Sequence, residues 1–335
     1  MNKRIEYIDL AKGICILLIA LTHTYGDSGG RVMEVLSFFK IPVFFMLSGF
    51  FFRKYDSCTT FIKKKTNQLL IPIFFSFIFF SLLSTLFFYI KSGDNLIIRD
   101  IFFLPDTWKI NFGLSPSTWF LVCLLLIDIL CYCIYRVFEE NFTFLIILAF
   151  LGGGVGYYLN FRDISIPIWF DTALTTIPYF IIGNLIWTKT GFMLEKNSFK
   201  HYLFFLVTFI VVLFMIYTMG ENDNIFYAAN RYTDVGIVRL YMSGFAGSFF
   251  IVLLSKFIVK IPIVSYIGRY SIVVLITHQF YLFVIRNILY QINAPQDSIW
   301  VSLGVFILVV LISLPTIKYG IKYFPYCFAQ KELLK

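Results

Sequence analysis

The chain has 335 residues, of which 59% are hydrophobic and only 14% are charged, and it contains 42 Phe and 21 Tyr. A typical soluble domain has about half apolar and about a quarter charged residues, because it must cover itself with polar side chains. The composition therefore excludes an ordinary soluble domain and predicts an integral membrane protein.

The net charge of +9 does not indicate nucleic-acid binding. Most Lys and Arg residues lie in short connectors between apolar runs, as the positive-inside rule expects. The cysteines form no CxxC pair and have no His at metal-ligand spacing, so we expect neither disulfides nor a metal site. They are Cys15, Cys58, Cys123, Cys131, Cys133 and Cys327.

Ten apolar runs are long enough to cross a bilayer as α-helices, which takes about 17–25 residues each. They lack the alternation of a barrel strand, so we predict an all-α membrane protein with a single polytopic domain over residues 1–335. The predicted spans are 7–24, 36–52, 70–90, 118–135, 142–160, 169–188, 202–219, 235–255, 265–288 and 299–317. We expect the first span to be retained, because Glu6 and Asp9 interrupt the positively charged n-region of a signal peptide and no cleavage site follows.

The distribution of positive charge predicts that both termini are cytoplasmic. With the N-terminus inside, 19 Lys and Arg residues fall on the inner side, against nine on the outer side or at helix ends. The largest outer loops are 91–117 and 220–234. Their polar and aromatic side chains are Asp94, Asp100, Asp106, Trp108, Glu221 and Asp223. This mixture suits a sugar ligand, but ordinary solvated loops have the same composition.

The first span carries ionisable residues, which cost about 2.5–3.5 kcal/mol each at a helix centre and are therefore candidates for function. Asp9, Lys12, Ile16, Ile19 and His23 are spaced 3, 4, 3 and 4 residues apart and share one helical face. Lys12 and His23 are about 16 Å apart along the axis. One helix thus offers a cation for a donor phosphate at one end and a general base at the other. Equally, Asp9 and Lys12 could form an interfacial ion pair, with His23 a hydrogen-bonded structural residue.

The segment IDLAKGICILLIALTH (8–23) resembles the opening of the membrane acyltransferase-3 family, whose members O-acetylate surface glycans. The first helix of that family carries an acidic residue, an Arg, ten intervening residues and a His. Asp9, Lys12 and His23 stand at these positions. Lys12 replaces the usual Arg, which keeps the charge but loses the bidentate fork for phosphate or carboxylate.

Four further segments are similar to the family pattern, in the same order. They are IPVFFMLSGFFF (41–52) with Ser48 and Gly49, FIKKKTNQLLIPIFF (61–75) with its three lysines and Pro72, STWFLVCLL (117–125) with Trp119, and IGRYSIVVLITHQF (267–280) with Ser271 and His278. Each segment is short, but together they cover most of the chain.

The resemblance implies a membrane O-acyltransferase that moves an acyl group, with acetyl as the first expectation, from cytoplasmic acyl-CoA to a hydroxyl of a cell-surface or lipid-linked carbohydrate. It implies acetyl-CoA or another acyl-CoA as donor, no metal, the inner membrane as location, and the bilayer and the carbohydrate as partners. Self-association into a homo-oligomer stays open. The implied catalytic residues are His23, Asp9 and Lys12; the coenzyme would bind Lys12, Arg53, Lys63, Lys64 and Lys65; the acceptor would bind Trp119 and His278.

Each of these assignments has a structural alternative. The lysines could be a positive-inside anchor, Trp119 a residue of the aromatic belt and His278 a link between helices. A different class of function is a transporter or flippase for a lipid-linked or small solute. Its path would be lined by polar residues within spans: Asp128, Asp171, Asn184 and His278.

Overall fold

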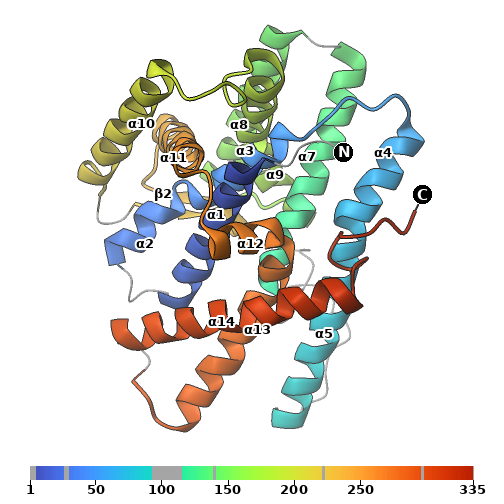
Figure 1. The fold of residues 1–335 in the computed structure, drawn as a ribbon, viewed down its shortest axis with the longest axis vertical. Coiled ribbons are helices and arrows are strands. Elements are labelled where there is room, and N and C mark those ends of the chain that lie inside the picture. Colours follow the sequence, from blue (N-terminus) through green and yellow to red (C-terminus); the bar gives the residue numbers. More distant parts are fainter. Residues whose placement is uncertain are drawn as a thin grey trace.

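The structure is a computed structural model that describes residues 5–25, 30–92, 115–138, 141–220, 223–295 and 298–334. This part of the chain is almost entirely helical (Figure 1). The α-helices are α1 (Glu6–Tyr25), α2 (Gly30–Ser37), α3 (Lys40–Phe50), α4 (Cys58–Lys65), α5 (Ile71–Ser92), α7 (Trp119–Phe138), α8 (Phe142–Phe161), α9 (Phe170–Leu185), α10 (Phe199–Tyr217), α11 (Ile237–Ile258), α12 (Pro262–Arg269), α13 (Ser271–Gln291) and α14 (Ile299–Tyr323). Within the described residues, the exception to the all-α prediction is a small hairpin of β1 (Asn224–Phe226) and β2 (Arg231–Thr233), in which Ile225 lies opposite Tyr232.

Nine helical segments of the described chain are long and apolar enough to cross a membrane. They are Glu6–Tyr25, Met33–Phe50, Cys58–Phe87, Pro116–Phe138, Phe142–Phe161, Phe199–Tyr217, Ile237–Ile258, Ser271–Gln291 and Ile299–Tyr323. Each corresponds to one of the predicted spans. The remaining predicted span, 169–188, corresponds to α9, which has only 16 residues as an α-helix because the chain continues as the π-helical segment η5 (Ile186–Thr190).

Two predicted boundaries are wrong. The third span begins well before residue 70, because α4 continues through the π-helical segment η2 (Thr66–Leu70) directly into α5. Lys63, Lys64 and Lys65 therefore lie in the last turn of a helix and not in a loop. The ninth span is broken at Tyr270, which separates α12 from α13.

The helices α1, α3, α9 and α11 form the centre of the molecule, and nearly all residues of α3 and α9 are buried. Glycine allows α3 and α9 to pack closely. A Cβ atom at Gly49 would overlap the carbonyl oxygen of Phe180, and one at Gly183 would overlap the carbonyl oxygen of Met46. Small residues at helix contacts are typical of membrane proteins, where packing rather than exclusion of water holds the helices together.

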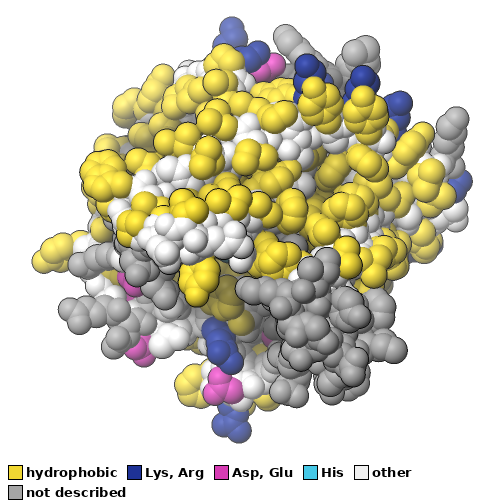
Figure 2. All heavy atoms as spheres, turned by 90° about the horizontal axis from the view of Figure 1, so that it is seen from below, with side chains coloured by type: hydrophobic (Ala, Val, Ile, Leu, Met, Phe, Trp, Pro, Cys, Tyr) yellow, Lys and Arg dark blue, Asp and Glu magenta, His cyan; other side chains and the backbone are white. Residues whose placement is uncertain are grey.

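The outer helices expose hydrophobic side chains, including Phe74 of α5, Leu151 of α8, Leu206 of α10 and Leu311 of α14. Figure 2 shows a broad band of hydrophobic side chains on one face, with charged side chains mainly along its upper margin and in the lower part of the view. In water such a surface would be strongly unfavourable, whereas lipid tails require it. The chain is therefore a multi-pass α-helical membrane protein.

The segment after α14 returns to α4, as Figure 1 shows at the end marked C. The side chain of Asn67 donates to the carbonyl oxygen of Leu334 (2.8 Å) and accepts from the backbone N–H groups of Leu333 (2.8 Å) and Leu334 (3.0 Å). Lys64 donates to Glu332 at 2.6 Å. These contacts attach the last described residues to the helix that carries the three lysines.

Candidate active site

Two cavities lie one after the other along the same three helices. The first, here called the basic cavity, has a volume of about 620 Å³ and includes Lys12 of α1, Ser48 of α3 and Leu124 of α7. The second, here called the aromatic cavity, has a volume of about 350 Å³ and includes His23 of α1, Phe44 of α3 and Phe120 of α7. Lys12 and His23, eleven positions apart on α1, thus each line one of the two cavities.

The basic cavity collects cations from three segments that are distant in sequence. These cations are Lys12, Arg53, Lys54, Lys64 and Lys65. Four of the five residues predicted to bind a coenzyme are among them, and Lys54 is added. The remaining one, Lys63, is not a lining residue, because only one face of α4 is turned towards the cavity.

The charges of the basic cavity are not equally available to a ligand. Lys65 contacts Asp128 of α7 at 2.8 Å with both side chains buried, and this pair carries no net charge. Lys64 is paired with Glu332 in an exposed ion pair, which contributes little and can exchange with another anion. The Nζ atom of Lys12 lies 5.0 Å from the centre of the Phe51 ring, a cation–π geometry. Arg53 and Lys54 are exposed.

A smaller cavity of about 370 Å³ shares Arg53 and Lys54 with the basic cavity and adds Arg136. Together these side chains form a cationic surface that suits a ligand with several phosphate groups.

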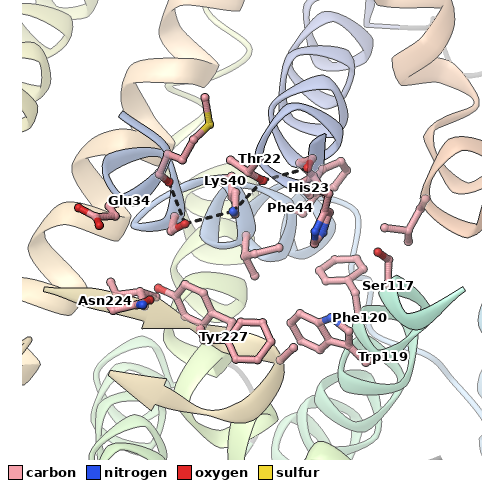
Figure 3. A pocket seen from close by; sticks show the side chains of 18 of the residues that line it. Thr22, His23, Glu34, Lys40, Phe44, Ser117, Trp119, Phe120, Asn224 and Tyr227 are labelled. Carbon is pink, nitrogen blue, oxygen red and sulfur yellow. Dashed lines mark hydrogen bonds between the residues drawn. The ribbon is translucent and has the colours of Figure 1, made fainter. Parts of the chain in front are cut away.

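The aromatic cavity has His23 on one side and aromatic rings on the other (Figure 3). His23 lies in the last turn of α1 and its side chain is exposed to the cavity. Trp119 and Phe120 come from the start of α7, and Tyr227 follows β1. Trp119 thus lines the same cavity as His23, and its predicted role in binding an acceptor stays a prediction.

The predicted outer loop 220–234 forms part of this cavity through residues 224–228. Asp223 does not line it: its carboxylate contacts Arg239 at 2.9 Å and accepts from the Gly220 N–H at 2.9 Å. The other polar loop residues that were singled out lie outside the described residues: Asp94, Asp100, Asp106, Trp108 and Glu221.

His278 packs behind His23, with ring centres 5.5 Å apart and planes inclined by 36°. It is 1% exposed and does not line the aromatic cavity. Its Nδ1 atom lies 2.8 Å from the Val274 carbonyl oxygen, which can only accept, so the neutral ring carries its proton on Nδ1. Nε2 is then an acceptor, 3.4 Å from the hydroxyl of Ser117, and Ser117 does line the cavity. His278 therefore contacts His23 and Ser117 from behind the cavity, and its predicted part in binding the acceptor stays a prediction.

Asp9 lies one turn before Lys12 and is half-buried, but it lines neither cavity. Its predicted role in orienting Lys12 stays a prediction.

The wall between the two cavities is about one helical turn thick. Phe44 and Phe120 line the aromatic cavity, and the residues four positions later, Ser48 and Leu124, line the basic cavity. A four-residue step along a helix is about 6 Å. The rings of Phe44 and Phe120 meet edge to face, with centres 5.7 Å apart, and form the aromatic side of this wall.

Sequence reasoning missed Lys40, which lines the aromatic cavity next to Thr22. In the sequence, Lys40 is one of the nine cations on the outer side or at helix ends, because a continuous apolar run begins directly after it. The rule that ionisable residues at membrane helices are functional candidates would have selected it.

Three of the polar residues that a transporter path would need make contacts within the protein. Asp128 of α7 is paired with Lys65 of α4 and lines the basic cavity, whereas Asp171 accepts from the Thr172 N–H of its own helix at 2.9 Å. Asn184 donates to the carbonyl oxygens of Gly49 and Phe52 at 3.0 and 2.9 Å and accepts from the hydroxyl of Tyr135 at 2.7 Å. Asn184 thus joins α9 to α3 and α7, and Asp171 and Asn184 line neither cavity.

Comparison with protein families agrees with the geometry. The family model described as an acyltransferase domain, Acyl_transf_3, matches residues 5–318. No curated protein and no solved structure matches the chain. The match begins just before α1 and ends within α14, so it includes both cavities and all the helices that form them. Because the family model covers most of the chain, the chain belongs to the acyltransferase-3 family. Its long apolar helices make it a membrane acyltransferase.

Proposed function

We propose that the chain transfers an acyl group, acetyl in the simplest case, from acyl-coenzyme A to a hydroxyl of a cell-surface or lipid-linked carbohydrate. The donor binds in the basic cavity from the cytoplasm, and the acceptor binds in the aromatic cavity on the other side of the inner membrane.

The observation that carries the proposal is the arrangement of two cavities on three shared helices. A cluster of cations is suited to the phosphates of coenzyme A, and a histidine lies in the other cavity about 16 Å away along α1. Only the thin wall at Phe44 and Phe120 separates them, so an extended thioester arm that passes this wall reaches His23. The aromatic rings suit the apolar faces of sugar rings, and polar side chains at the edge suit their hydroxyls.

The proposed reaction uses His23 as a general base. The acceptor hydroxyl oxygen attacks the thioester carbonyl carbon while His23 takes the hydroxyl proton. The carbon–sulfur bond then breaks, and the coenzyme thiolate takes the proton back from the imidazolium. The products are a carbohydrate ester and free coenzyme A. A route through an acyl-His23 intermediate balances equally and differs in that labelled acyl groups remain on the protein when acceptor is omitted.

The test is a binding and transfer assay on the purified protein in lipid nanodiscs. Acetyl-coenzyme A should bind, and binding should weaken when Lys12 is replaced by Gln but not when His23 is replaced by Ala. Transfer of radiolabelled acetyl to a carbohydrate should require His23. Absence of acyl-coenzyme A binding by folded protein would refute the proposed donor and favour a transporter.

A further inference from the structure

Lys40 is a cation in the aromatic cavity to which the proposed reaction gives no task. It is the first residue of α3, half-buried, and its ammonium group faces the same cavity as His23 (Figure 3). A cation at the first turn of a helix opposes the helix dipole, so its position does not stabilise α3. An ionisable residue held at a membrane helix without that benefit is a candidate for ligand binding.

Hydroxyl groups, and no carboxylate, hold this ammonium group. Lys40 donates to the Thr22 hydroxyl at 2.9 Å and to the Ser37 hydroxyl at 3.1 Å. Each of these hydroxyls in turn donates its own proton to a backbone carbonyl oxygen, that of Ile19 (2.9 Å) and that of Met33 (3.0 Å). Both are therefore fixed as acceptors for Lys40, which orients the ammonium group. An ammonium group has three N–H donors, so one is left for a ligand.

Within the described residues Lys40 makes no ion pair. Glu34 lines the same cavity but is not within ion-pair distance of Lys40, and Figure 3 shows the two side chains apart. The cavity is otherwise lined mainly by aromatic and aliphatic side chains, which solvate a charge poorly. An anion on the ligand would therefore find an oriented ammonium group that no described carboxylate contacts directly.

The size and the walls of the cavity indicate which anion fits. A volume of about 350 Å³ is at the small end of ligand sites and suits one or two sugar rings. Trp119 and Tyr227 offer ring faces, and Asn224 offers an amide. A single ammonium group balances the single charge of a carboxylate.

We propose that Lys40 binds the carboxylate of an acidic sugar, such as a uronic acid, and so makes the enzyme specific for acidic acceptors. This inference rests on the proposed function and names its substrate class. The carboxylate would also assist the reaction, because it neutralises Lys40 at the moment when His23 becomes a cation in the same cavity.

The experiment compares two acceptors that differ only at C6: methyl β-glucuronide and methyl β-glucoside. Binding of each is measured by saturation-transfer NMR on protein in nanodiscs, and acetyl transfer is measured with labelled acetyl-coenzyme A. The wild type should prefer the glucuronide by roughly 10- to 100-fold in both measurements, the range expected for one charged hydrogen bond. Lys40→Gln should remove the preference, and Lys40→Arg should keep most of it. Lys318→Gln, which removes a lysine of α14 outside both cavities, should change neither.

The outcomes separate the two proposals. Equal binding of the two acceptors, or a preference that Lys40→Gln retains, overturns the role of Lys40 whether or not transfer occurs. Lys40-dependent binding of the glucuronide without any transfer supports the carboxylate site and counts against the proposed reaction. Equal transfer to both acceptors supports the reaction and refutes the acidic specificity.

Discussion

Replacing His23 by alanine should reduce acyl transfer about 10²- to 10⁴-fold while donor binding stays near normal. General acid–base catalysis contributes a factor of this size. At about 1.36 kcal/mol for each factor of ten, the barrier would rise by roughly 2.7–5.4 kcal/mol. Donor binding should not change, because His23 lies in the aromatic cavity and the cations lie in the basic cavity.

Neither nitrogen base next to His23 is placed to take over its role. His278 is the adjacent imidazole, but it is buried, does not line the cavity and directs Nδ1 at Val274. Lys40 donates to two hydroxyls and is expected to be a cation, which cannot accept a proton. The remaining rate in His23→Ala should therefore come from placing donor and acceptor together and from any proton transfer to Glu34, a carboxylate that lines the same cavity.

Two other histidines serve as controls. His278→Ala should lower the amount of folded protein, because the loss of a large buried side chain reduces the free energy of unfolding by about 3 kcal/mol. His201→Ala tests a remote site: this residue is buried, stacks on Phe192 with ring centres 4.2 Å apart and lies 2.9 Å from the Lys256 ammonium nitrogen. It should affect folding without changing turnover per folded molecule.

The assay is single-turnover transfer of labelled acetyl groups, normalised to folded protein measured by size-exclusion chromatography. Near-normal transfer by folded His23→Ala would refute the catalytic reading of α1. An equal loss in His201→Ala would show that the assay reports folding and not chemistry.

Three further predictions concern the basic cavity and the topology. In a protein without native cysteines, a membrane-impermeant thiol reagent added to intact cells should label cysteines introduced at positions 29 and 94 but not at 60 or 330; labelling at 60 would refute the predicted orientation. Lys64→Gln should weaken coenzyme A binding and its salt dependence more than Lys63→Gln, because of these two lysines only Lys64 lines the cavity. Equal effects of the two substitutions in an equilibrium binding assay would count against a specific site. Asp128→Asn should destabilise the fold by about 3–5 kcal/mol, because it leaves the buried Lys65 unpaired, and replacing both residues by apolar ones should recover much of this loss in a denaturation assay; no recovery would contradict the pair.

The order of most helices could be predicted, because each span is visible in its own stretch of sequence as an apolar run of bilayer length. The internal breaks could not be predicted in the same way. The π-helical segments after α4 and α9 arise from packing among helices, and hydropathy does not register them. For the same reason the predicted third span, which starts at residue 70, leaves out the three lysines, although they belong to the helix that continues into it.

The candidate site was predictable where its residues share one helix and not where they meet across helices. Lys12 and His23 could be linked by spacing alone, and they do lie at the two cavities. The pairing of Lys65 with Asp128 depends on how α4 lies against α7, which no local pattern encodes. For Lys40 the residue type and position are visible in the sequence. Its two hydroxyl partners, Thr22 of α1 and Ser37 of α2, lie on two other helices, and only the fold brings them to Lys40.

The wall at Phe44 and Phe120 also has a consequence for the permeability of the membrane. Where two water-accessible hollows approach each other, most of the electrical potential difference drops across the thin layer that separates them. An ion that entered this layer would lose its hydration, and aromatic and aliphatic groups offer no replacement for it. In the proposed reaction a thioester arm passes Phe44 and Phe120. The same two side chains must therefore also block the passage of ions across the membrane. Making both rings small is expected to produce an ion leak, observable as a conductance in planar bilayers.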